Sequence, residues 1–416
     1  MPISRKQKQI MAFPYTSYDA LICDGAIRSG KTVFMMLSFV DDAMRRYNNQ
    51  RFGICGKTVD STVKNLIIPY LSLSYAKGKY NIQWRRTDKI MVVSNGEREN
   101  IFEIFGGKDE SSFALIQGRT LAGVLFDEVA LQPKSFVDQA CARCSVDGSK
   151  MWFNCNPASP QHWFYTEWIC QLKKHNAIRI HFLLEDNPSL SEHIINRYKS
   201  TYSGVFYRRY ILGEWCLAEG LIYSMFDGTR NICSPRNDAE RYFLSCDYGT
   251  QNPFALGLIS ARSTEQGTVY HLERELYYDG RKSGQLTDSE YADRLTEFCS
   301  DVDIQSVIVD PSAASFIAEL RKRGYRVIKA RNDVIDGIRY VSSALIDGRL
   351  LISPDCENTL REFGVYSWDE KAGERGEDKP IKQNDHAMDM LRYALYTDKI
   401  NIATGRNRYS GKGGRT

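Results

Sequence analysis

The chain has 416 residues, 43% of them apolar, and carries 55 lysine and arginine residues against 51 aspartate and glutamate residues. This length exceeds one ordinary hydrophobic core, so two domains are expected. The whole positive excess lies in Asn401 to Thr416, which contains basic residues and no acid. A uniformly basic nucleic-acid-binding protein is therefore excluded, and any nucleic-acid surface must be a local patch.

No apolar run approaches the length of a membrane span, and the first residues lack the apolar core of a signal peptide. We therefore expect a soluble intracellular protein with no membrane partner. Cys141 and Cys144 have CxxC spacing, but no second pair follows, so helix packing is favoured over metal or redox chemistry. Four other cysteines fall in or beside strand-like runs and are predicted to be reduced core residues: Cys23, Cys55, Cys155 and Cys246.

In residues 20–32 an apolar strand runs into a glycine-bounded loop and then into an apolar-periodic helix. This is the pattern of a Walker A phosphate loop. Gly25 and Gly30 allow the backbone to curl so that its N–H groups face phosphate oxygens. Lys31 is placed to reach the β- and γ-phosphates, and the Thr32 hydroxyl to bind Mg²⁺ at the positive end of the helix. The flanking strand and helix favour nucleotide binding over a structural loop.

Alternating strands and helices follow, with a strand from Gly123 that ends in Asp127 and Glu128. This acidic pair has the pattern of a Walker B element. Asp127 would hold Mg²⁺ through its water shell, and Glu128 would orient or deprotonate the water that attacks the γ-phosphate. Such a pair is also a common helix N-cap, but the upstream phosphate loop favours the catalytic interpretation. Other strands are expected at 51–56, 89–94 and 101–105.

A strand at 151–156 ends in Asn154 to Asn156, just before Pro157. Uncharged hydrogen-bonding groups at this point can sense the γ-phosphate, but Asn-Pro is equally a turn signal, so both interpretations remain open. A strand at 177–182 and a helix at 202–210 complete a domain that we place at residues 1–215.

Residues 216–238 lack clear periodicity and are predicted to connect this domain to a second α/β unit at 239–400, which has no phosphate loop. Its expected elements are strands at 242–247, 254–259 and 269–272, a helix at 289–298, a strand at 306–309 and a helix at 384–393.

Three separated acids occur on these elements. Asp247 and Asp310 end strands, and Asp389 lies on the late helix with His386 on the same face. Two Mg²⁺ or Mn²⁺ ions held by such carboxylates can activate water and stabilise the leaving oxygen in phosphodiester cleavage. Strand-end aspartates also cap helices, so the spacing leaves nuclease chemistry and a structural role open.

In this order the motifs resemble those of the large subunit of tailed-bacteriophage DNA-packaging terminases, which join a packaging ATPase to a nuclease of ribonuclease-H-like fold. The similarity covers nearly the whole chain: Gly25 to Thr32, Leu121 to Ala130, Asn154 to Pro157, Cys246 to Gly249, Val309 to Ser312 and Asp385 to Asp389. It implies an α/β fold with a mostly parallel sheet in an N-terminal P-loop ATPase domain and a mixed sheet in the nuclease domain. It also implies ATP and Mg²⁺ as cofactors, with Mn²⁺ as an alternative at the nuclease site.

The resemblance also implies roles for individual residues. Glu128 would be the catalytic carboxylate of the motor, and Gln7 would read adenine, with Gln9 as a close competitor. The other nucleotide-site residues implied are Gly25, Arg28, Ser29, Gly30, Lys31, Thr32, Asp127 and Asn156, the last from a coupling motif that spans Asn154 to Asn156. The nuclease metal ligands implied are Asp247, Asp310, His386 and Asp389, with Asp385 as a substitute for Asp389.

Phosphoryl transfer also gains from a positive group at the γ-phosphate, often an arginine from a neighbouring subunit. Arg28 lies inside the phosphate loop and would act within its own subunit. Arg119, just before the acidic strand, could act in trans across an interface, although a solvated turn arginine is an equal alternative.

Two charged segments complete the chain. Residues 368–380 predict a solvated loop or hairpin, and in similar proteins a hairpin here borders the nuclease groove, so it could gate DNA access. The basic residues 401–416 are expected to form a flexible tail that could contact DNA phosphates or a partner.

The resulting hypothesis is a viral terminase large subunit that translocates double-stranded DNA into a procapsid with ATP and cuts concatemeric genomes with a metal-dependent endonuclease. The resemblance implies a small terminase subunit and a portal protein as partners, a homo-oligomeric ring during packaging, and the host cytoplasm as location. One alternative is a helicase-nuclease of DNA repair, which should have two motor lobes. The other is a nonenzymatic portal or capsid adaptor with relic sites, against which the complete phosphate loop argues.

Overall fold

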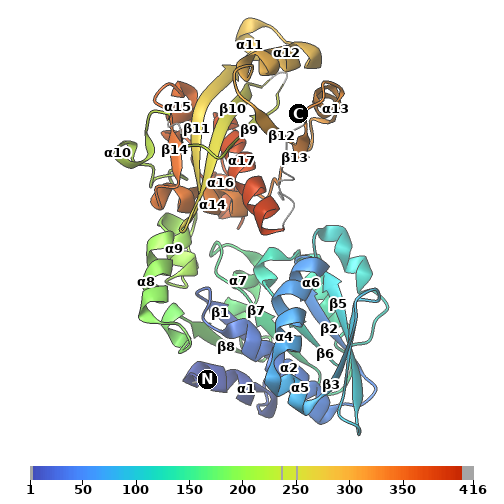
Figure 1. Ribbon diagram of the computed structural model, residues 1–416. Helices are drawn as coiled ribbons and strands as arrows, with labels where there is room; N and C mark the ends of the chain where they lie inside the picture. Colours follow the sequence, from blue (N-terminus) through green and yellow to red (C-terminus); the bar gives the residue numbers. More distant parts are fainter. Residues whose placement is uncertain (1–2, 236–237, 250–251, 405–416) are drawn as a thin grey trace. The chain divides into compact units, whose positions relative to one another are not determined.

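The computed structural model describes residues 3–235, 238–249 and 252–404. The chain divides into two compact units, each with its own sheet (Figure 1). The first holds the described residues up to Lys199, with Val205–Leu217 and Glu374–Glu377. The second holds Ser200–Gly204, Ala218–Gly373 and the described residues from Asp378 onward.

The first unit is built on an eight-stranded sheet in the order β3-β4-β5-β2-β6-β7-β1-β8. All neighbouring strands from β5 to β8 run parallel, and β4 is antiparallel to β3 and β5. The mostly parallel sheet that was predicted for this domain is confirmed. The strands are β1 Ala20–Gly25, β2 Arg51–Gly56, β3 Asn81–Arg85, β4 Ile90–Ser94, β5 Glu99–Gly106, β6 Gly123–Phe126, β7 Lys150–Asn154 and β8 Ala177–Phe182.

The central strand β1 is buried on both faces, as its unbroken apolar run predicts. Leu21 and Cys23 face one core, which contains Phe39 of α2, while Ala20 and Ile22 face a second core. Successive side chains of a strand point to opposite faces, so one short strand contributes to both cores. The helices of this part of the chain are α1 Arg5–Ala12, α2 Lys31–Arg46, α3 Val59–Thr62, α4 Ile68–Ser72, α5 Ser74–Lys79, α6 Lys134–Ala142, α7 Trp163–Glu167, α8 Glu192–Thr201 and α9 Gly204–Tyr210.

The second unit has a six-stranded mixed sheet in the order β13-β12-β9-β10-β11-β14. β9, β10 and β11 form an antiparallel meander, and β12 lies parallel to β9. The predicted mixed sheet is confirmed, and the central position of the first strand is the arrangement expected for a ribonuclease-H-like unit. The strands are β9 Arg241–Asp247, β10 Phe254–Thr264, β11 Gly267–Tyr278, β12 Ile304–Val309, β13 Val327–Lys329 and β14 Leu350–Ile352.

Helices cover both faces of this sheet. Residues of α12 and α13 share one core with β9 and β10. On α17, the Met390 carbonyl accepts a hydrogen bond of 2.9 Å from Ser245 Oγ of β9. Met390 also fills the space beside Gly257 of β10, where an added Cβ would lie 2.7 Å from the methionine sulfur. The helices are α10 Gly228–Asn231, α11 Gly280–Ser283, α12 Asp288–Phe298, α13 Ala314–Lys322, α14 Val334–Ile346, α15 Glu357–Phe363, α16 Glu370–Glu374 and α17 His386–Ala403.

Three predicted segments differ in detail from the structure. Most of the predicted connector, 216–238, packs within the second unit, where the Ile222 and Cys233 amides donate to Tyr366 and Ile352. Residues 368–380 form a closed loop, since Trp368 and Pro380 make an antiparallel bridge around the short helix α16. α17 continues to Ala403, so the first residues of the predicted tail are helical, and residues 405–416 lie outside the described residues.

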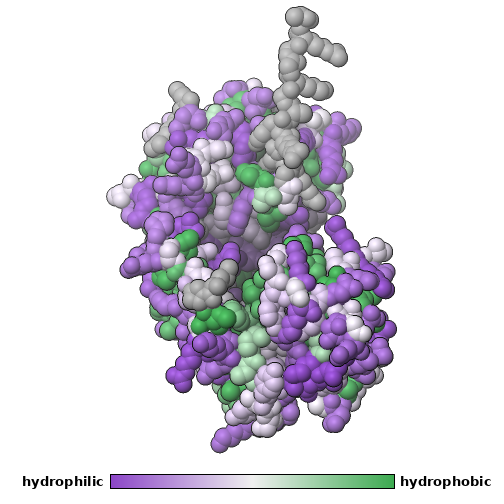
Figure 2. Space-filling model, turned by 60° about the horizontal axis from the view of Figure 1, so that its bottom comes forward, coloured by the Kyte–Doolittle hydropathy of each residue, from purple (hydrophilic) through white to green (hydrophobic). Residues whose placement is uncertain are grey.

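The surface is mainly hydrophilic on the face shown in Figure 2, where hydrophobic residues form separate patches. In the part of the chain that the structure describes, no helix has the length and apolar character needed to cross a membrane. All eleven cysteines are unpaired, and Cys23, Cys55, Cys155 and Cys246 are buried as predicted.

Candidate nucleotide and nuclease sites

The phosphate loop joins the end of β1 to the start of α2, as the sequence predicts. Gly25 and Gly30 have φ angles of +123° and +84°, which side chains rarely adopt. A Cβ at Gly25 would also lie 2.0 Å from the carbonyl oxygen of Phe182 on β8. The glycines are therefore required by the path of the loop, and α2 begins at Lys31 with its N–H groups facing the loop.

Neighbouring segments hold the loop in place. The Ala26 amide donates to Phe182 O at 2.8 Å, and the Ile27 amide donates to Tyr210 O at 2.9 Å. Asn187 Nδ2 donates to the carbonyl oxygen of Arg28 at 2.7 Å. Sequence analysis missed Asn187, because nothing local connects it to a loop 159 residues away.

The Lys31 ammonium lies inside the loop. Its Nζ donates to the carbonyl oxygens of Ala26 at 2.6 Å and Gly25 at 3.2 Å, to Ser29 Oγ at 3.2 Å and to Asn156 Oδ1 at 3.4 Å. Burial lowers the pKa of Lys31 to about 8. An anionic group in the loop would favour the charged form, so the position suits a phosphate. The structure thus brings together four predicted residues, Gly25, Ser29, Lys31 and Asn156.

Asn154 links the two predicted Mg²⁺-binding side chains. Its Nδ2 donates to Thr32 Oγ1 at 3.0 Å and to Asp127 Oδ1 at 2.6 Å. Burial raises the pKa of Asp127, and the hydrogen bond from Asn154 opposes this shift. The Asn154 Oδ1 is buried and has no hydrogen-bond partner among the described residues. Within the predicted coupling motif, Asn156 therefore contacts the phosphate-binding lysine and Asn154 contacts the metal-binding pair.

Glu128 directly follows Asp127 and is half-buried. Its backbone has a φ of 53°, in the left-handed region that a residue with a Cβ seldom adopts. Strained backbone of this kind is common at functional sites because the surrounding structure must hold it in place. The preceding residue is fixed by a hydrogen bond of 2.8 Å from the Asp127 amide to Cys55 O.

Gln7 and Gln9 differ clearly in the structure. Gln7 is 2% exposed, whereas Gln9 is exposed. The Gln7 amide lies against the phosphate loop, since a Cβ on Gly30 would be 2.4 Å from Gln7 Nε2. Gln7 Oε1 accepts from the Ser4 amide at 2.9 Å, which fixes the side chain at the start of α1. Of the two predicted candidates, Gln7 is the one beside the loop.

The two candidate arginines lie in different places. Arg28 is exposed within the phosphate loop, with a φ of 54°. Arg119 precedes β6, whereas the phosphate loop follows the carboxyl end of the parallel strand β1, so Arg119 lies toward the opposite edge of the sheet. Its Nε is 3.3 Å from Glu103 Oε2, and Arg51 pairs with the other oxygen of that carboxylate. Arg119 therefore does not reach the phosphate loop of its own chain.

The strand that leads into the loop also carries a buried charge. Asp24 is fully buried and accepts two hydrogen bonds from Arg179 of β8, at 2.8 and 2.6 Å, and one from Trp215 Nε1 at 2.8 Å. Burial acts to raise the pKa of Asp24, but hydrogen bonds from His181, Arg179 and Trp215 lower it to about 2. This ion pair ties β1, β8 and the end of the first unit to one carboxylate.

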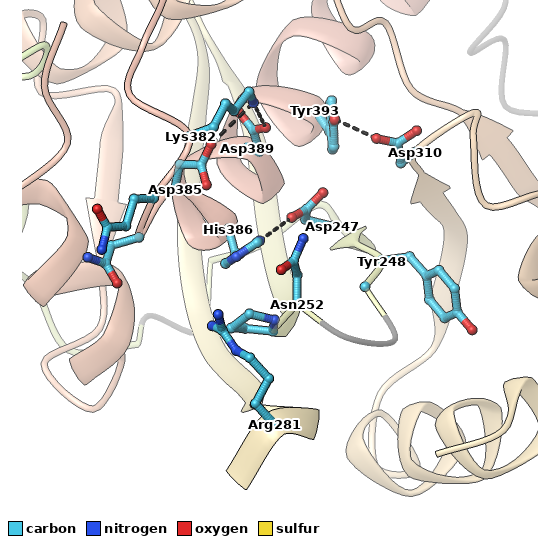
Figure 3. A pocket seen from close by; sticks show the side chains of 14 residues that line it. Asp247, Tyr248, Asn252, Arg281, Asp310, Lys382, Asp385, His386, Asp389 and Tyr393 are labelled. Carbon is cyan, nitrogen blue, oxygen red and sulfur yellow. Dashed lines mark hydrogen bonds and ion pairs between the residues drawn. The ribbon is translucent and has the colours of Figure 1, made fainter. Parts of the chain in front are cut away.

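The second site is a cavity of about 360 Å³ in the second unit (Figure 3). Asp247 ends β9, Asp310 follows β12, and His386 and Asp389 lie in the first turn of α17. All four predicted residues line this cavity, together with Asp385. Strand ends and a helix start that are far apart in sequence thus meet at one place.

Asp247 and Asp310 are each held by one neighbouring side chain. His386 Nδ1 lies 2.8 Å from Asp247 Oδ2. Burial raises the pKa of Asp247, and the hydrogen bond to His386 opposes this shift. Burial acts to lower the pKa of His386, but the same bond raises it. Tyr393 Oη donates to Asp310 Oδ2 at 2.6 Å and the Ser312 amide to Oδ1 at 2.7 Å. Burial acts to raise the pKa of Asp310, but these two bonds lower it.

Asp389 is bound by two basic residues that sequence analysis missed. Arg392 Nη2 donates to its Oδ1 at 2.9 Å, and Lys382 Nζ donates to its Oδ2 at 3.0 Å. Lys382 also lies 3.2 Å from Asp385 Oδ2, so one ammonium bridges both acids (Figure 3). The i, i+3 spacing of Asp389 and Arg392 was a usable signal. No local pattern identifies Lys382, which precedes the helix.

Carboxylate and imidazole ligands of this kind fit a hard divalent cation. In the described residues, however, no three acidic, histidine or cysteine side chains are grouped as a metal would require. Both oxygens of Asp389 are taken by basic groups. The donor set therefore suits a metal, and Asp389 would have to exchange its contact with Lys382 to join it.

A phosphate loop and an acidic pair on a mostly parallel sheet, followed by an acid-lined cavity on a mixed sheet, define a P-loop ATPase joined to a ribonuclease-H-like unit. Residues 22–230 match the family model described as "Terminase large subunit, T4likevirus-type, N-terminal". The chain belongs to the family of bacteriophage terminase large subunits. It is therefore an ATPase of viral DNA packaging.

Solved structures agree over nearly the whole length. The large terminase of a thermophilic bacteriophage is 49% identical, covers 95% of this chain with 99% of its own, and superposes with a TM-score of 0.92. Two further structures of that large terminase, in complex with ADP and with ATP-γ-S, are 48% and 47% identical, cover 95% of this chain and 99% of their own, and have TM-scores of 0.90 and 0.88. Comparison with curated proteins finds no match.

Proposed function

We propose that the first unit hydrolyses MgATP to drive double-stranded DNA into a procapsid, and that the second unit cuts the DNA. The observation that carries the motor assignment is the chain of contacts from Thr32 through Asn154 to Asp127, next to Lys31 in the phosphate loop. The large terminase of the thermophilic bacteriophage, which is similar over nearly the whole chain, has been determined with ADP and ATP-γ-S.

In the motor, Lys31 and the loop amides bind the β- and γ-phosphates, and Gln7 lies where it can contact the base. Thr32 and Asp127 would hold Mg²⁺, which neutralises charge that develops on the phosphates. Glu128 orients the attacking water and accepts its proton. Asn154 keeps the Thr32 and Asp127 side chains in a fixed relation, so both remain aimed at one point.

In the second unit, Asp247, Asp310 and Asp389 would hold Mg²⁺ or Mn²⁺, which when bound supplies an activated water for phosphodiester hydrolysis. His386 orients Asp247, and Tyr393 orients Asp310. Lys382 has to release Asp389 before that carboxylate can bind metal. Asp385 shares the same lysine and is the alternative ligand.

The proposed partners are double-stranded DNA, a small terminase subunit and the portal protein, in a ring of identical subunits in the host cytoplasm. A helicase-nuclease is disfavoured because the second described sheet carries an acid-lined cavity in place of a second motor lobe. An adaptor with relic sites is disfavoured because the contacts around Lys31 and Asp127 are intact.

Cleavage of supercoiled plasmid by the full chain tests the nuclease assignment. We expect nicked and linear products with Mg²⁺ or Mn²⁺, and no products when EDTA is in excess, because the carboxylates need a metal to act on a phosphodiester. The melting temperature in EDTA serves as the control for folding. Equal cleavage with and without EDTA, or no cleavage with either metal, would contradict the assignment.

Arg119 is proposed to act in trans, because it does not reach the phosphate loop of its own chain. Arg119→Ala chains should be poor ATPases that regain activity when mixed with Glu128→Gln chains. When equal amounts mix at random in a ring, about a quarter of the sites pair an intact Glu128 with a neighbour's intact Arg119. Phosphate release is measured under conditions where rings form. Arg51→Ala, which removes the other partner of Glu103, is the matched control. Full activity of Arg119→Ala alone, or absence of rescue in demonstrated rings, rejects this role.

A further inference from the structure

A basic residue lies across the nuclease cavity from its acids. Arg281 belongs to the short helix α11, which follows β11, and it lines the same cavity as Asp247, Asp310, Asp385 and Asp389. Figure 3 shows its side chain rising from α11 toward the side of the cavity where His386 and Asn252 lie. No motif in the sequence pointed to this residue.

The charges of the cavity set Arg281 apart from the other basic group, Lys382. The Lys382 ammonium is shared between Asp385 and Asp389, so it neutralises acids of the cavity itself. Arg281 instead pairs with Asp279, which does not line the cavity, through its Nε at 3.2 Å. The Arg281 side chain is 62% exposed, and exposed ion pairs of this kind are weak.

The terminal nitrogens of Arg281 therefore remain available to a ligand. Neither Nη atom makes a hydrogen bond or ion pair with another residue in the described parts of the chain. A guanidinium in this position can form two parallel hydrogen bonds to a phosphate.

We propose that Arg281 binds a backbone phosphate of the DNA strand that is cut and holds that strand over the acids. This inference rests on the proposed nuclease function. A DNA strand that enters a cavity lined by four carboxylates meets strong repulsion, and a cation on the facing wall offsets it. The contact is to the sugar-phosphate backbone, so Arg281 positions the strand without reading its sequence.

Lys282 provides a matched control. It is the next residue on α11, its side chain is 82% exposed, and its Nζ lies 3.8 Å from the other oxygen of Asp279. It does not line the cavity. Removing either side chain lowers the net charge of α11 by the same amount, but only Arg281 faces the acids.

The test is steady-state cleavage of a duplex DNA by the full chain with Mn²⁺, for unchanged protein, Arg281→Ala and Lys282→Ala. We expect Arg281→Ala to raise KM for DNA about 10- to 100-fold, the loss typical of a hydrogen bond to a charged group, with a smaller change in kcat. The slope of log affinity against log salt should fall by about one in Arg281→Ala. Arg281→Lys should restore the salt slope but only part of KM, because lysine keeps the charge and lacks the fork. ATPase activity and the melting temperature report whether each variant is folded.

The possible failures are distinct. If unchanged protein does not cleave DNA with Mn²⁺ or Mg²⁺, the nuclease function itself is wrong. If unchanged protein cleaves and Arg281→Ala matches Lys282→Ala in KM and salt slope, the role of Arg281 is wrong. If Arg281→Ala does not fold, Arg281→Gln and Arg281→Lys carry the same comparison, and equal KM values in those two folded variants also overturn the proposal.

Discussion

Glu128→Gln chains are expected to bind ATP as tightly as unchanged chains and to hydrolyse it about 100- to 10,000-fold more slowly, the contribution usual for a general base. The amide keeps the size of the side chain but cannot accept a proton at neutral pH. The groups that bind phosphate, Lys31 and the loop backbone, are separate from Glu128 and unchanged. Phosphate release measures turnover, and displacement of a fluorescent nucleotide measures binding.

Lys31→Ala provides the opposite pattern, because it removes the cation from the loop and should weaken ATP binding itself. Glu110→Gln is a matched control: it removes an acidic side chain from the helical turn after β5 and leaves the acidic pair intact. Normal turnover in Glu128→Gln would reject the assignment of the catalytic carboxylate. Loss of ATP binding in Glu128→Gln would show that this residue acts in binding instead.

Asp310→Asn is expected to reduce DNA cleavage at least about 100-fold, the scale of one preorganised charged group in an active site, while ATPase activity stays nearly unchanged. The substitution preserves shape and an oxygen that can still accept from Tyr393, but it removes the negative charge that a divalent cation requires. Asp247→Asn should behave in the same way. Linearisation of plasmid and ATP hydrolysis are measured on the same preparations.

Asp303→Asn is the control, since Asp303 is an exposed aspartate just before β12, the strand that ends at Asp310. Its cleavage activity should equal that of unchanged protein. If Asp310→Asn loses both activities and remains folded by its melting temperature, the two sites are not independent, and the division of the chain into a motor and a nuclease is wrong.

The parts of the fold that sequence analysis predicted are those with local patterns. The phosphate loop is one example, because Gly25, Gly30 and Lys31 lie on one continuous strand, loop and helix, and each requirement is local. Asp247 and Asp310 could be found because an apolar strand followed by an acid is a pattern of a few residues. Both sheets agree with the predicted types for the same reason, since their central strands are unbroken apolar runs.

The contacts that sequence analysis missed connect distant segments. Asp24 meets Trp215 across 191 residues, and Asp310 meets Tyr393 across 83. No periodicity encodes such pairs, since they depend on which strand ends and helix starts the topology brings together. The choice between Gln7 and Gln9 was open for a related reason: both lie on one short helix, and only burial against Gly30 separates them.

The ion pairs around Asp389 also bear on how the second unit survives between cuts. Buried acids gathered at one point would repel each other and loosen the start of α17, as happens in small domains that unfold without their metal. Here Arg392, which is 2% exposed, and Lys382 supply the compensating charge from within the chain. The helix therefore has an internal counterion. Metal ions can leave and return with each round of cutting while the subunit that holds the genome keeps its shape.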